Sequence, residues 1–351
     1  MAKTHRSTSF PHAFRNRSVA LLGLGYWGQN ILRTLGQLQL KRLVVCDEAP
    51  HRLSQALEVV PHAKGVRHLD EILDDPEIDA VCVATPVEFH VQHAKAILRA
   101  GKHVFIEKPL SYSAKSARII GDAARKARKR VMVGHIYLHH PAILQLRQWI
   151  ASGKLGKIQW IRSTRCSLGP RVRHDVDVLW DYAIHDIYLI PFLMGKAASR
   201  VRADGRPCLK PPRADWVEFS MEFHGSRAVM HGFVSWLNPF KERTLMVVGS
   251  KGIAVFDELK QPCLTFYRCG YAPHKGMDRW GNLGLRLFDD GREELSLDCQ
   301  QSLSRELAHF LSHLETKAPP HASFADGLTT IRLLEKLSSS LAKKGRWVSV
   351  S

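Results

Sequence analysis

Residues 19–28 read Val-Ala-Leu-Leu-Gly-Leu-Gly-Tyr-Trp-Gly and place Gly23, Gly25 and Gly28 directly after a short apolar run. A continuous apolar run is typical of a strand that is buried on both faces of a parallel sheet. Glycines in the spacing G-x-G-x-x-G permit a tight turn from strand to helix, and the backbone N–H groups at the helix start attract phosphate. The stretch predicts a strand, a phosphate-binding turn and a helix.

Asp47 supplies the second half of a dinucleotide fingerprint. It stands 19 residues after Gly28, at the end of the next apolar run. A carboxylate there can accept hydrogen bonds from both hydroxyls of an adenosine ribose. Asp47 and Glu48 would repel a 2′-phosphate, and the first basic residue beyond His51 is Arg52. We therefore expect NAD as the cofactor, in preference to NADP.

The chain up to Gly134 alternates between short apolar runs and helical stretches. This alternation predicts a doubly wound parallel (Rossmann) sheet over residues 18–134. The expected strands are Val19–Leu22, Leu43–Cys46, Ala80–Ala84, Val104–Ile106 and Val131–Val133, and the expected helices are Trp27–Leu38, Pro50–Glu58, Leu69–Leu73, Val87–Ala100 and Ala114–Lys129.

Residues 135–351 predict an α+β domain with a large, mostly antiparallel, open-faced sheet, because strand-like runs follow one another through short turns. Residues 1–17 are expected to form a disordered basic tail, and the C-terminal helices to pack back on the first domain. The expected strands are Ile158–Thr164, Trp216–Phe223, Arg227–Trp236, Arg243–Val248 and Ile253–Asp257; the expected helices are Pro141–Ile150, Trp180–Met194, Ser302–Glu315 and Gly327–Lys343.

The composition has one unusual feature, a formal net charge of +18 from 51 basic and 33 acidic residues. The excess is concentrated in four windows, 1–17, 115–130, 162–173 and 196–213. No known nucleic-acid-binding pattern accompanies it, so we expect no nucleic-acid partner. No apolar run is long enough for a membrane helix. The seven cysteines form no C-x-x-C, which favours a reducing cytoplasm and no bound metal.

Three further motifs resemble those of the Gfo/Idh/MocA oxidoreductases. They are Ala84-Thr85-Pro86 followed by His90, Glu107-Lys108-Pro109 after a strand, and the turn Val248-Gly249-Ser250-Lys251-Gly252 before another. The resemblance extends over nearly the whole chain. It implies an NAD-dependent enzyme that transfers hydride at a CH–OH group, with cofactor contacts from Gly23, Gly25, Tyr26, Trp27, Gly28, Asp47, Thr85, Pro86, His90, Glu107 and Lys108.

The resemblance also implies the catalytic residues. Lys108 maps onto the family's catalytic lysine and is followed by Pro109, for which a cis peptide is implied. Asp181 and His185 match the family's Asp-x-Gly-x-His element, with Ala183 in place of glycine. Residues four apart share one helix face, so the carboxylate can fix the imidazole tautomer while the other ring nitrogen takes a hydroxyl proton. Asp186 is read either as a surface charge or as an orienting group.

Residues 162–181 contain arginines that resemble a substrate loop in the nucleotide-sugar branch of the family. Arg165, Arg171 and Arg173 are expected to bind a diphosphate. The implied reaction is oxidation at C3 of a UDP-amino sugar such as UDP-N-acetylglucosamine, giving a 3-keto sugar. Alternatives are a TDP-3-keto-deoxysugar reductase, an inositol or free-sugar dehydrogenase, a non-catalytic NAD sensor, and a nucleic-acid-binding protein. A homodimer or homotetramer is expected because the open-faced sheet needs a cover.

Overall fold

The computed structural model describes residues 13–168, 175–209, 212–277, 283–299 and 301–350. Arg171 and Arg173 lie outside these residues. The chain divides into two compact units. Unit 1 comprises Met1–His139 and Gln300–Ile331, and unit 2 comprises His140–Cys299 and Arg332–Ser351.

Unit 1 is built on a parallel sheet in the order β3-β2-β1-β4-β5-β6. From β1 to β3 the strands are added on one side of β1, and from β4 to β6 they are added on the other side. The loops after β1 and β4 therefore diverge at the carboxyl edge of the sheet, where open α/β sheets bind ligands. Its strands are β1 (Ala13–Leu22), β2 (Gln39–Cys46), β3 (Lys64–Val66), β4 (Ala80–Val83), β5 (His103–Ile106) and β6 (Val131–Val133).

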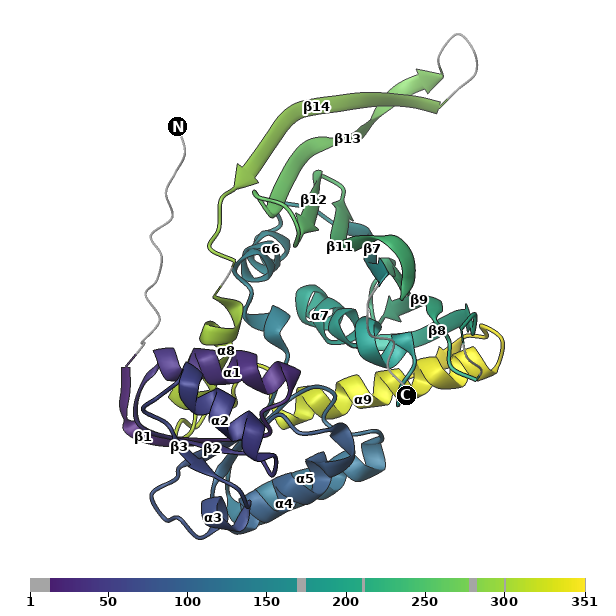
Figure 1. The fold of residues 1–351 in the computed structure, drawn as a ribbon. Helices are drawn as coiled ribbons and strands as arrows, with labels where there is room; N and C mark the ends of the chain where they lie inside the picture. The colour runs from purple at the N-terminus through teal and green to yellow at the C-terminus, as the bar shows by residue number, and fades with distance from the viewer. Residues whose placement is uncertain (1–12, 169–174, 210–211, 278–282, 300, 351) are drawn as a thin grey trace. The chain divides into compact units, whose positions relative to one another are not determined.

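Helices cover both faces of this sheet, with α1 and α2 on one side and α4 and α5 on the other (Figure 1). The central strands β4 and β5 are buried at every residue, as expected where helices keep water from both faces of a sheet. The helices are α1 (Tyr26–Gln37), α2 (Pro50–Val59), α3 (Asp70–Leu73), α4 (Val87–Arg99), α5 (Ala114–Ala127), the 3-10 turn η1 (Ile136–His139) and α8 (Ser302–Ser312).

Strand β1 corrects the expected extent of the basic tail. It begins at Ala13, where we expected loose chain through residue 17. Phe14 is 7% exposed, and Arg17 forms an ion pair with Glu315 across 2.8 Å. Parallel pairing with β2 and the burial of an aromatic ring draw these residues into the sheet.

Unit 2 is built on a nine-stranded sheet in the order β14-β13-β12-β11-β7-β10-β9-β8-β15. Among the described strand pairs of this sheet, only β7 and β10 run parallel, and the others are antiparallel. The strands are β7 (Ile158–Leu168), β8 (Ala198–Arg206), β9 (Trp216–Phe223), β10 (Val229–Ser235), β11 (Leu237–Gly249), β12 (Gly252–Asp257), β13 (Leu264–Met277), β14 (Leu283–Leu295) and β15 (Val348–Ser349).

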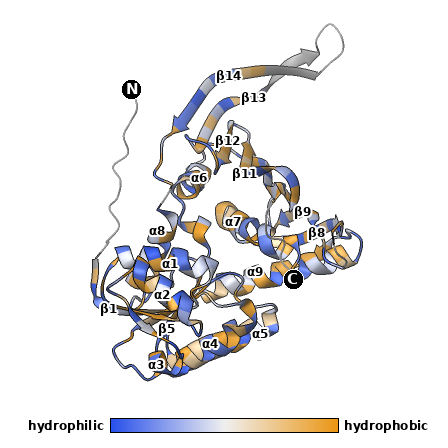
Figure 2. Ribbon diagram, viewed as in Figure 1, coloured by the Kyte–Doolittle hydropathy of each residue, from blue (hydrophilic) through white to orange (hydrophobic). Residues whose placement is uncertain are grey.

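The helices of unit 2 include α6 (Pro141–Ala151), the π-helical turn η2 (Leu179–Ala183) and α7 (Ile184–Met194). Much of α7 is strongly hydrophobic in Figure 2, and seven of its residues are buried. Helix α9 (Phe324–Ala342) begins in unit 1 and ends in unit 2. The expected parallel sheet followed by a mostly antiparallel one is confirmed.

Five strands were not predicted: β3, β8, β13, β14 and β15. In strand β8, small residues such as Ala198 and Ala203 are buried, while the arginines are exposed. The three arginines and one aspartate of β8 are typical of a loop that connects two elements, so the sequence did not indicate a strand there. No helix among the described residues has the length and apolar character needed to cross a membrane.

Candidate active site

The glycine turn after β1 has the shape that a pyrophosphate requires. Gly23 has φ +95, a value that side chains disfavour, and a Cβ on Gly28 would lie 2.1 Å from the Gly23 carbonyl oxygen. A Cβ on Gly25 would have no atom within 4 Å. Two glycines therefore make the turn, and Gly25 leaves open space against the backbone where a phosphate can approach the start of α1. Tyr26, the first residue of that helix, is exposed.

Asp47 is fixed beside this turn by the backbone. Its two carboxylate oxygens accept hydrogen bonds from the N–H groups of Leu24 at 2.8 Å and Ala49 at 3.0 Å. Arg52 lies 3.5 Å from the same carboxylate. Each carboxylate oxygen has a second lone pair for a ribose hydroxyl. The residues present fit the adenosine half of a dinucleotide.

Substitution of Asp47 by alanine is expected to raise the KM for NAD about 10- to 100-fold, because hydrogen bonds to a charged group contribute about 1.5–3 kcal/mol. The preference for NAD over NADP should fall as well, since Arg52 then loses its carboxylate partner. Steady-state kinetics with both cofactors measure this. Glu58→Ala, exposed on the neighbouring α2, is the control; an unchanged cofactor preference in Asp47→Ala would contradict the assignment.

His90 braces the two loops that follow β4 and β5. It is 1% exposed, and its ring nitrogens lie 2.9 Å from the Thr85 carbonyl oxygen and 3.0 Å from that of Pro109. Burial lowers the pKa of His90 to about 4, so the neutral ring has one N–H for two carbonyls. His90 thus positions Thr85 and the exposed Pro86, which is the N-cap residue of α4. The Lys108–Pro109 peptide bond is cis, as expected.

Glu107 connects the glycine turn to Lys108. Its carboxylate accepts hydrogen bonds from Trp27 Nε1 at 2.5 Å and from the backbone N–H of Lys108 at 3.2 Å. A Cβ on Gly134 would lie 2.9 Å from the Glu107 Oε2, so the glycine leaves room for the acid. Lys108 itself is half-buried at the carboxyl end of β5. The buried Glu107 thus holds the backbone of Lys108.

The surroundings of Lys108 contain a second buried acid and a neutral histidine. Burial raises the pKa of Glu107 to about 7. Burial, and then the charge of Glu107, raise the pKa of Glu306 on α8 well above its usual range. Burial, and then the charge of Lys108, lower the pKa of His135 to about 3. Sequence reasoning missed Glu306, which is far from Lys108 along the chain.

Glu107→Gln is expected to stabilise the chain increasingly as the pH rises. The pKa of Glu107 is raised in the folded state, so protonation favours folding below about pH 4.5 and this contribution is lost as the pH rises through about 7. The free energy of unfolding of the variant relative to wild type should rise by roughly 3 kcal/mol across this window. Urea titrations at several pH values measure the difference. A pH-independent difference would contradict the raised pKa, and Glu88→Gln, exposed on α4, is the control.

In unit 2, Asp181 and His185 lie on η2 and at the start of α7. The Nδ1 atom of His185 is 3.1 Å from the Tyr188 hydroxyl. Asp181 Oδ2 accepts a hydrogen bond from Trp236 Nε1 at 3.2 Å. The Tyr188 hydroxyl is thus also placed to orient the imidazole, the role expected of Asp181 and, in one of two interpretations, of Asp186. Tyr188 and Trp236 were missed because neither belongs to the recognised motif.

A pair of hydrogen-bonded hydroxyl groups joins η2 to strand β7. The Tyr182 hydroxyl is 2.8 Å from the Ser167 hydroxyl, at the end of β7. Trp180 Nε1 donates to the Ser338 hydroxyl on α9 at 3.0 Å. These bonds attach the π-helical turn to the sheet on one side and to α9 on the other. The groups fixed here are neutral hydrogen-bonding side chains.

Arg165 lies inside strand β7, where we had expected a substrate loop. Strand β7 continues to Leu168 because β10 and β11 pair with its two edges. Arg165 Nη2 is 3.3 Å from Asp186, with side chains 8% and 2% exposed, and Arg165 Nη1 is 3.8 Å from Glu258. Glu258 also pairs with Arg243 at 3.2 Å. Asp186 is therefore not a surface charge; the pair ties α7 to the sheet beside His185.

Arg165→Met is expected to destabilise the chain by about 3–5 kcal/mol, because it leaves the buried Asp186 without its cation. Replacing both partners in Arg165→Met/Asp186→Leu should restore most of this loss, since Glu258 keeps Arg243. Urea unfolding measures both variants. A stable Arg165→Met protein that has lost only substrate affinity would instead make Arg165 a substrate ligand.

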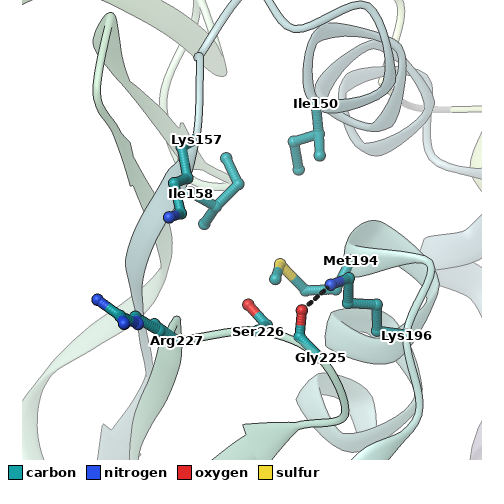
Figure 3. Close-up of a pocket in the computed structure, with 8 residues that line it drawn as sticks. All are labelled: Ile150, Lys157, Ile158, Met194, Lys196, Gly225, Ser226 and Arg227. Atoms are coloured by element: carbon teal, nitrogen blue, oxygen red, sulfur yellow. Dashed lines mark hydrogen bonds between the residues drawn. The ribbon is translucent and has the colours of Figure 1, made fainter.

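A cavity of about 660 Å³ lies at the other end of α7, near Met194 (Figure 3). Helix α7 has 11 residues, so this end is roughly 15 Å from His185. The cations Lys157 and Arg227 on its rim are exposed, and Lys196 Nζ donates to the Gly225 carbonyl. Neither a carboxylate nor a histidine is among the described residues that line it. Its lining is Ile150, Lys157, Ile158, Met194, Lys196, Gly225, Ser226 and Arg227.

Within the described ranges, no three His, Cys, Asp or Glu side chains are grouped so that they could hold a metal ion. The parallel sheet, the open glycine turn and the anchored Asp47 are the features of a unit that binds NAD. Two family models match this chain. The first, described as an oxidoreductase family with an NAD-binding Rossmann fold, matches residues 17–135, and the GFO/IDH/MocA C-terminal domain matches residues 143–255. The chain belongs to the Gfo/Idh/MocA oxidoreductases, and it is an NAD-dependent dehydrogenase acting on CH–OH groups.

The relatives of the chain include inositol dehydrogenases. It is 24% identical over 344 residues to myo-inositol 2-dehydrogenase of Thermotoga maritima, covering 93% of this chain and 96% of the relative. It is 30% identical over 185 residues to inositol 2-dehydrogenase 2 of Saccharopolyspora erythraea, covering 51% and 54%. The fold matches that of UDP-N-acetylglucosamine 3-dehydrogenase from Acidithiobacillus ferrooxidans with a TM-score of 0.74 at 22% identity, covering 93% and 97%.

Proposed function

We propose that this dehydrogenase oxidises one secondary hydroxyl of an uncharged cyclic polyol or sugar to the ring ketone, with Lys108, His185 and Asp181 as its catalytic residues. The observation that carries the proposal is the set of neutral hydrogen-bonding groups on η2, on α7 and among the residues bonded to them. Tyr188, Trp236 and the Tyr182–Ser167 pair are neutral hydrogen-bonding groups suited to a polyhydroxylated ring. The similarity to a myo-inositol 2-dehydrogenase over nearly the full length supports the same substrate class.

The proposed mechanism gives each catalytic residue a separate role. Lys108 hydrogen-bonds the reacting oxygen and stabilises the negative charge that develops on it. The Tyr188 hydroxyl engages Nδ1 of His185, so Nε2 is the atom that takes the proton of the substrate hydroxyl. NAD supplies the acceptor for the hydride that leaves the carbinol carbon. Arg165 and Asp186 hold α7, and with it His185, against the sheet.

The substrate class is tested by incubating purified protein with NAD and a panel of compounds while NADH absorbance is followed. The panel contains inositols, free hexoses and their anhydro forms, UDP- and TDP-sugars. We expect NADH formation with at least one uncharged cyclic compound, at a kcat/KM at least tenfold above that of any nucleotide sugar. Turnover of nucleotide sugars alone would contradict the proposal.

A UDP-amino-sugar 3-dehydrogenase is the second candidate. Arg171 and Arg173 favour it, because they follow β7 directly in the sequence and arginine suits a diphosphate. Arg165 does not strengthen it, since its guanidinium is engaged by Asp186 and Glu258. One double variant therefore distinguishes the two substrate classes. Arg171→Ala/Arg173→Ala should leave the turnover of a polyol unchanged and would abolish the turnover of a nucleotide sugar.

We further propose that the chain is a homo-oligomer. The β13–β14 hairpin carries Tyr271 and Leu287 as a cross-strand pair, 67% and 62% exposed. Paired exposed apolar side chains are typical of a contact surface. Light scattering of the purified protein should give a multiple of the 39.7 kDa chain mass, and Tyr271→Glu should reduce it. A monomer at all concentrations would contradict the proposal.

A further inference from the structure

Two cysteine thiols outside the candidate active site face one another in unit 2. Cys263 directly precedes β13, and Cys299 follows β14. Their sulfur atoms are 2.7 Å apart. A disulfide bond is about 2.05 Å long, so only a small approach separates the two thiols from a bond. Cys263 is 2% exposed and Cys299 is half-buried, which leaves Cys299 as the thiol that a small molecule can reach.

Polar side chains around Cys299 favour its thiolate. The hydrogen bond from the Cys263 thiol, followed by those from His140 and Gln261, lowers the pKa of Cys299 below that of an ordinary thiol. Nδ1 of His140 accepts the backbone N–H of Ala142 at 3.2 Å, so the ring proton lies on Nε2 and can be donated to sulfur. The same sulfur–sulfur hydrogen bond and burial raise the pKa of Cys263. The pair thus consists of one reactive thiol and one protonated partner.

The other cysteines lack this arrangement. Burial raises the pKa of Cys46 and of Cys166 to about 12, and that of Cys82 also rises. Cys208 is exposed, and Cys269 is half-buried on β13. In the described chain, Cys263 and Cys299 are the cysteines whose sulfur atoms are hydrogen-bonded to each other. Oxidation by a dilute oxidant should therefore select them from among seven thiols.

We propose that Cys263 and Cys299 are a reversible oxidation site that forms an intramolecular disulfide when the protein meets a peroxide. The Cys299 thiolate attacks one peroxide oxygen, the O–O bond breaks, and the leaving hydroxide takes up a proton. The sulfenic acid so formed is attacked by the Cys263 sulfur, which releases a second water. In total, two thiols are oxidised to one disulfide and one hydrogen peroxide is reduced to two waters.

The cross-link would restrain the chain at a boundary between its units. Cys299 is the last residue of unit 2 before the chain continues into unit 1 at Gln300, and His140 is the first residue of unit 2. A disulfide to Cys263 fastens the segment after β14 to the turn before β13, 36 positions earlier. It closes a loop that contains the whole β13–β14 hairpin. Oxidation therefore should slow amide hydrogen exchange in residues 296–299.

The test uses the full-length reduced protein, one equivalent of hydrogen peroxide, alkylation of the remaining thiols and peptide mass mapping. We expect two of the seven thiols to be lost, a peptide linkage between Cys263 and Cys299, and recovery of seven thiols with dithiothreitol. Both cysteines remaining alkylatable, or a linkage to another cysteine or another chain, would overturn the proposal. This result needs no variant, so a folding defect cannot obscure it.

Two substitutions then separate the roles of the thiols. Cys263→Ser should retain the peroxide reaction but yield Cys299 as sulfenic acid, trapped by dimedone, with no disulfide. Cys299→Ser should slow thiol loss at least tenfold. Cys208→Ser, at an exposed cysteine, is the matched control and should form the disulfide as wild type does. Equal peroxide reactivity in Cys299→Ser and wild type would show that Cys299 is not the attacking thiol.

Discussion

Lys108→Met is expected to lower kcat about 10³-fold or more while NAD binding persists, because the variant loses the one cation that we assign to the reacting oxygen. Methionine keeps the length and apolar stem of lysine, so packing at the end of β5 is retained. The cofactor residues Asp47 and Thr85 are untouched. Stopped-flow NADH formation measures the chemical step, and fluorescence titration with NADH measures binding.

Lys126→Met is the matched control for this prediction. Lys126 is an exposed lysine on α5, in the same unit, and its removal should change kcat by less than twofold. A Lys108→Met variant with wild-type kcat would remove Lys108 from the catalytic residues. A wild-type protein that binds NADH yet forms none from any alcohol would instead indicate a cofactor-binding sensor without turnover.

His185→Gln is expected to lower kcat by about 10² to 10⁴, the range for loss of a positioned general base. In wild type the rate should fall toward acidic pH, because a protonated imidazole cannot accept the hydroxyl proton. The variant should lose this acid limb and depend instead on hydroxide, so that its rate rises steadily with pH. The pH dependence of kcat therefore identifies the base more sharply than the loss in rate alone.

Two controls accompany the His185 variant. Tyr188→Phe removes the hydroxyl that engages Nδ1 and should displace the acid limb without removing it. His224→Gln, at an exposed histidine in the turn after β9, should leave the pH profile unchanged. An acid limb that survives in His185→Gln would show that another group accepts the proton.

The cofactor unit was predictable from sequence because its signals are local. Strands buried on both faces must be apolar, and the turn after β1 needs glycine at Gly23 for its positive φ and at Gly28 for lack of space. Asp47 is fixed by backbone N–H groups a few residues away from the strand end. The resemblance to the family contributed Lys108 and the Asp181–His185 element, which composition and spacing would not have revealed.

The features that could not be predicted from the sequence depend on contacts between distant parts of the chain. Arg165 looked like part of an exposed loop because nothing local shows that β10 and β11 extend β7 or that Asp186 lies beneath it. Strand β13 contains arginine, lysine, glycine and proline, and β14 contains glycine and several charged residues, so neither is a continuous apolar run. Glu306 reaches Glu107 only after α8 packs in unit 1.

In the proposed reaction, hydride passes directly from a ring carbinol carbon to NAD. This transfer is tested by supplying the best polyol of the panel with deuterium at the oxidised carbon. We expect all of the deuterium to appear in NADH and the chemical step to slow severalfold. NADH that carries no deuterium, with the label found in solvent water, would contradict it.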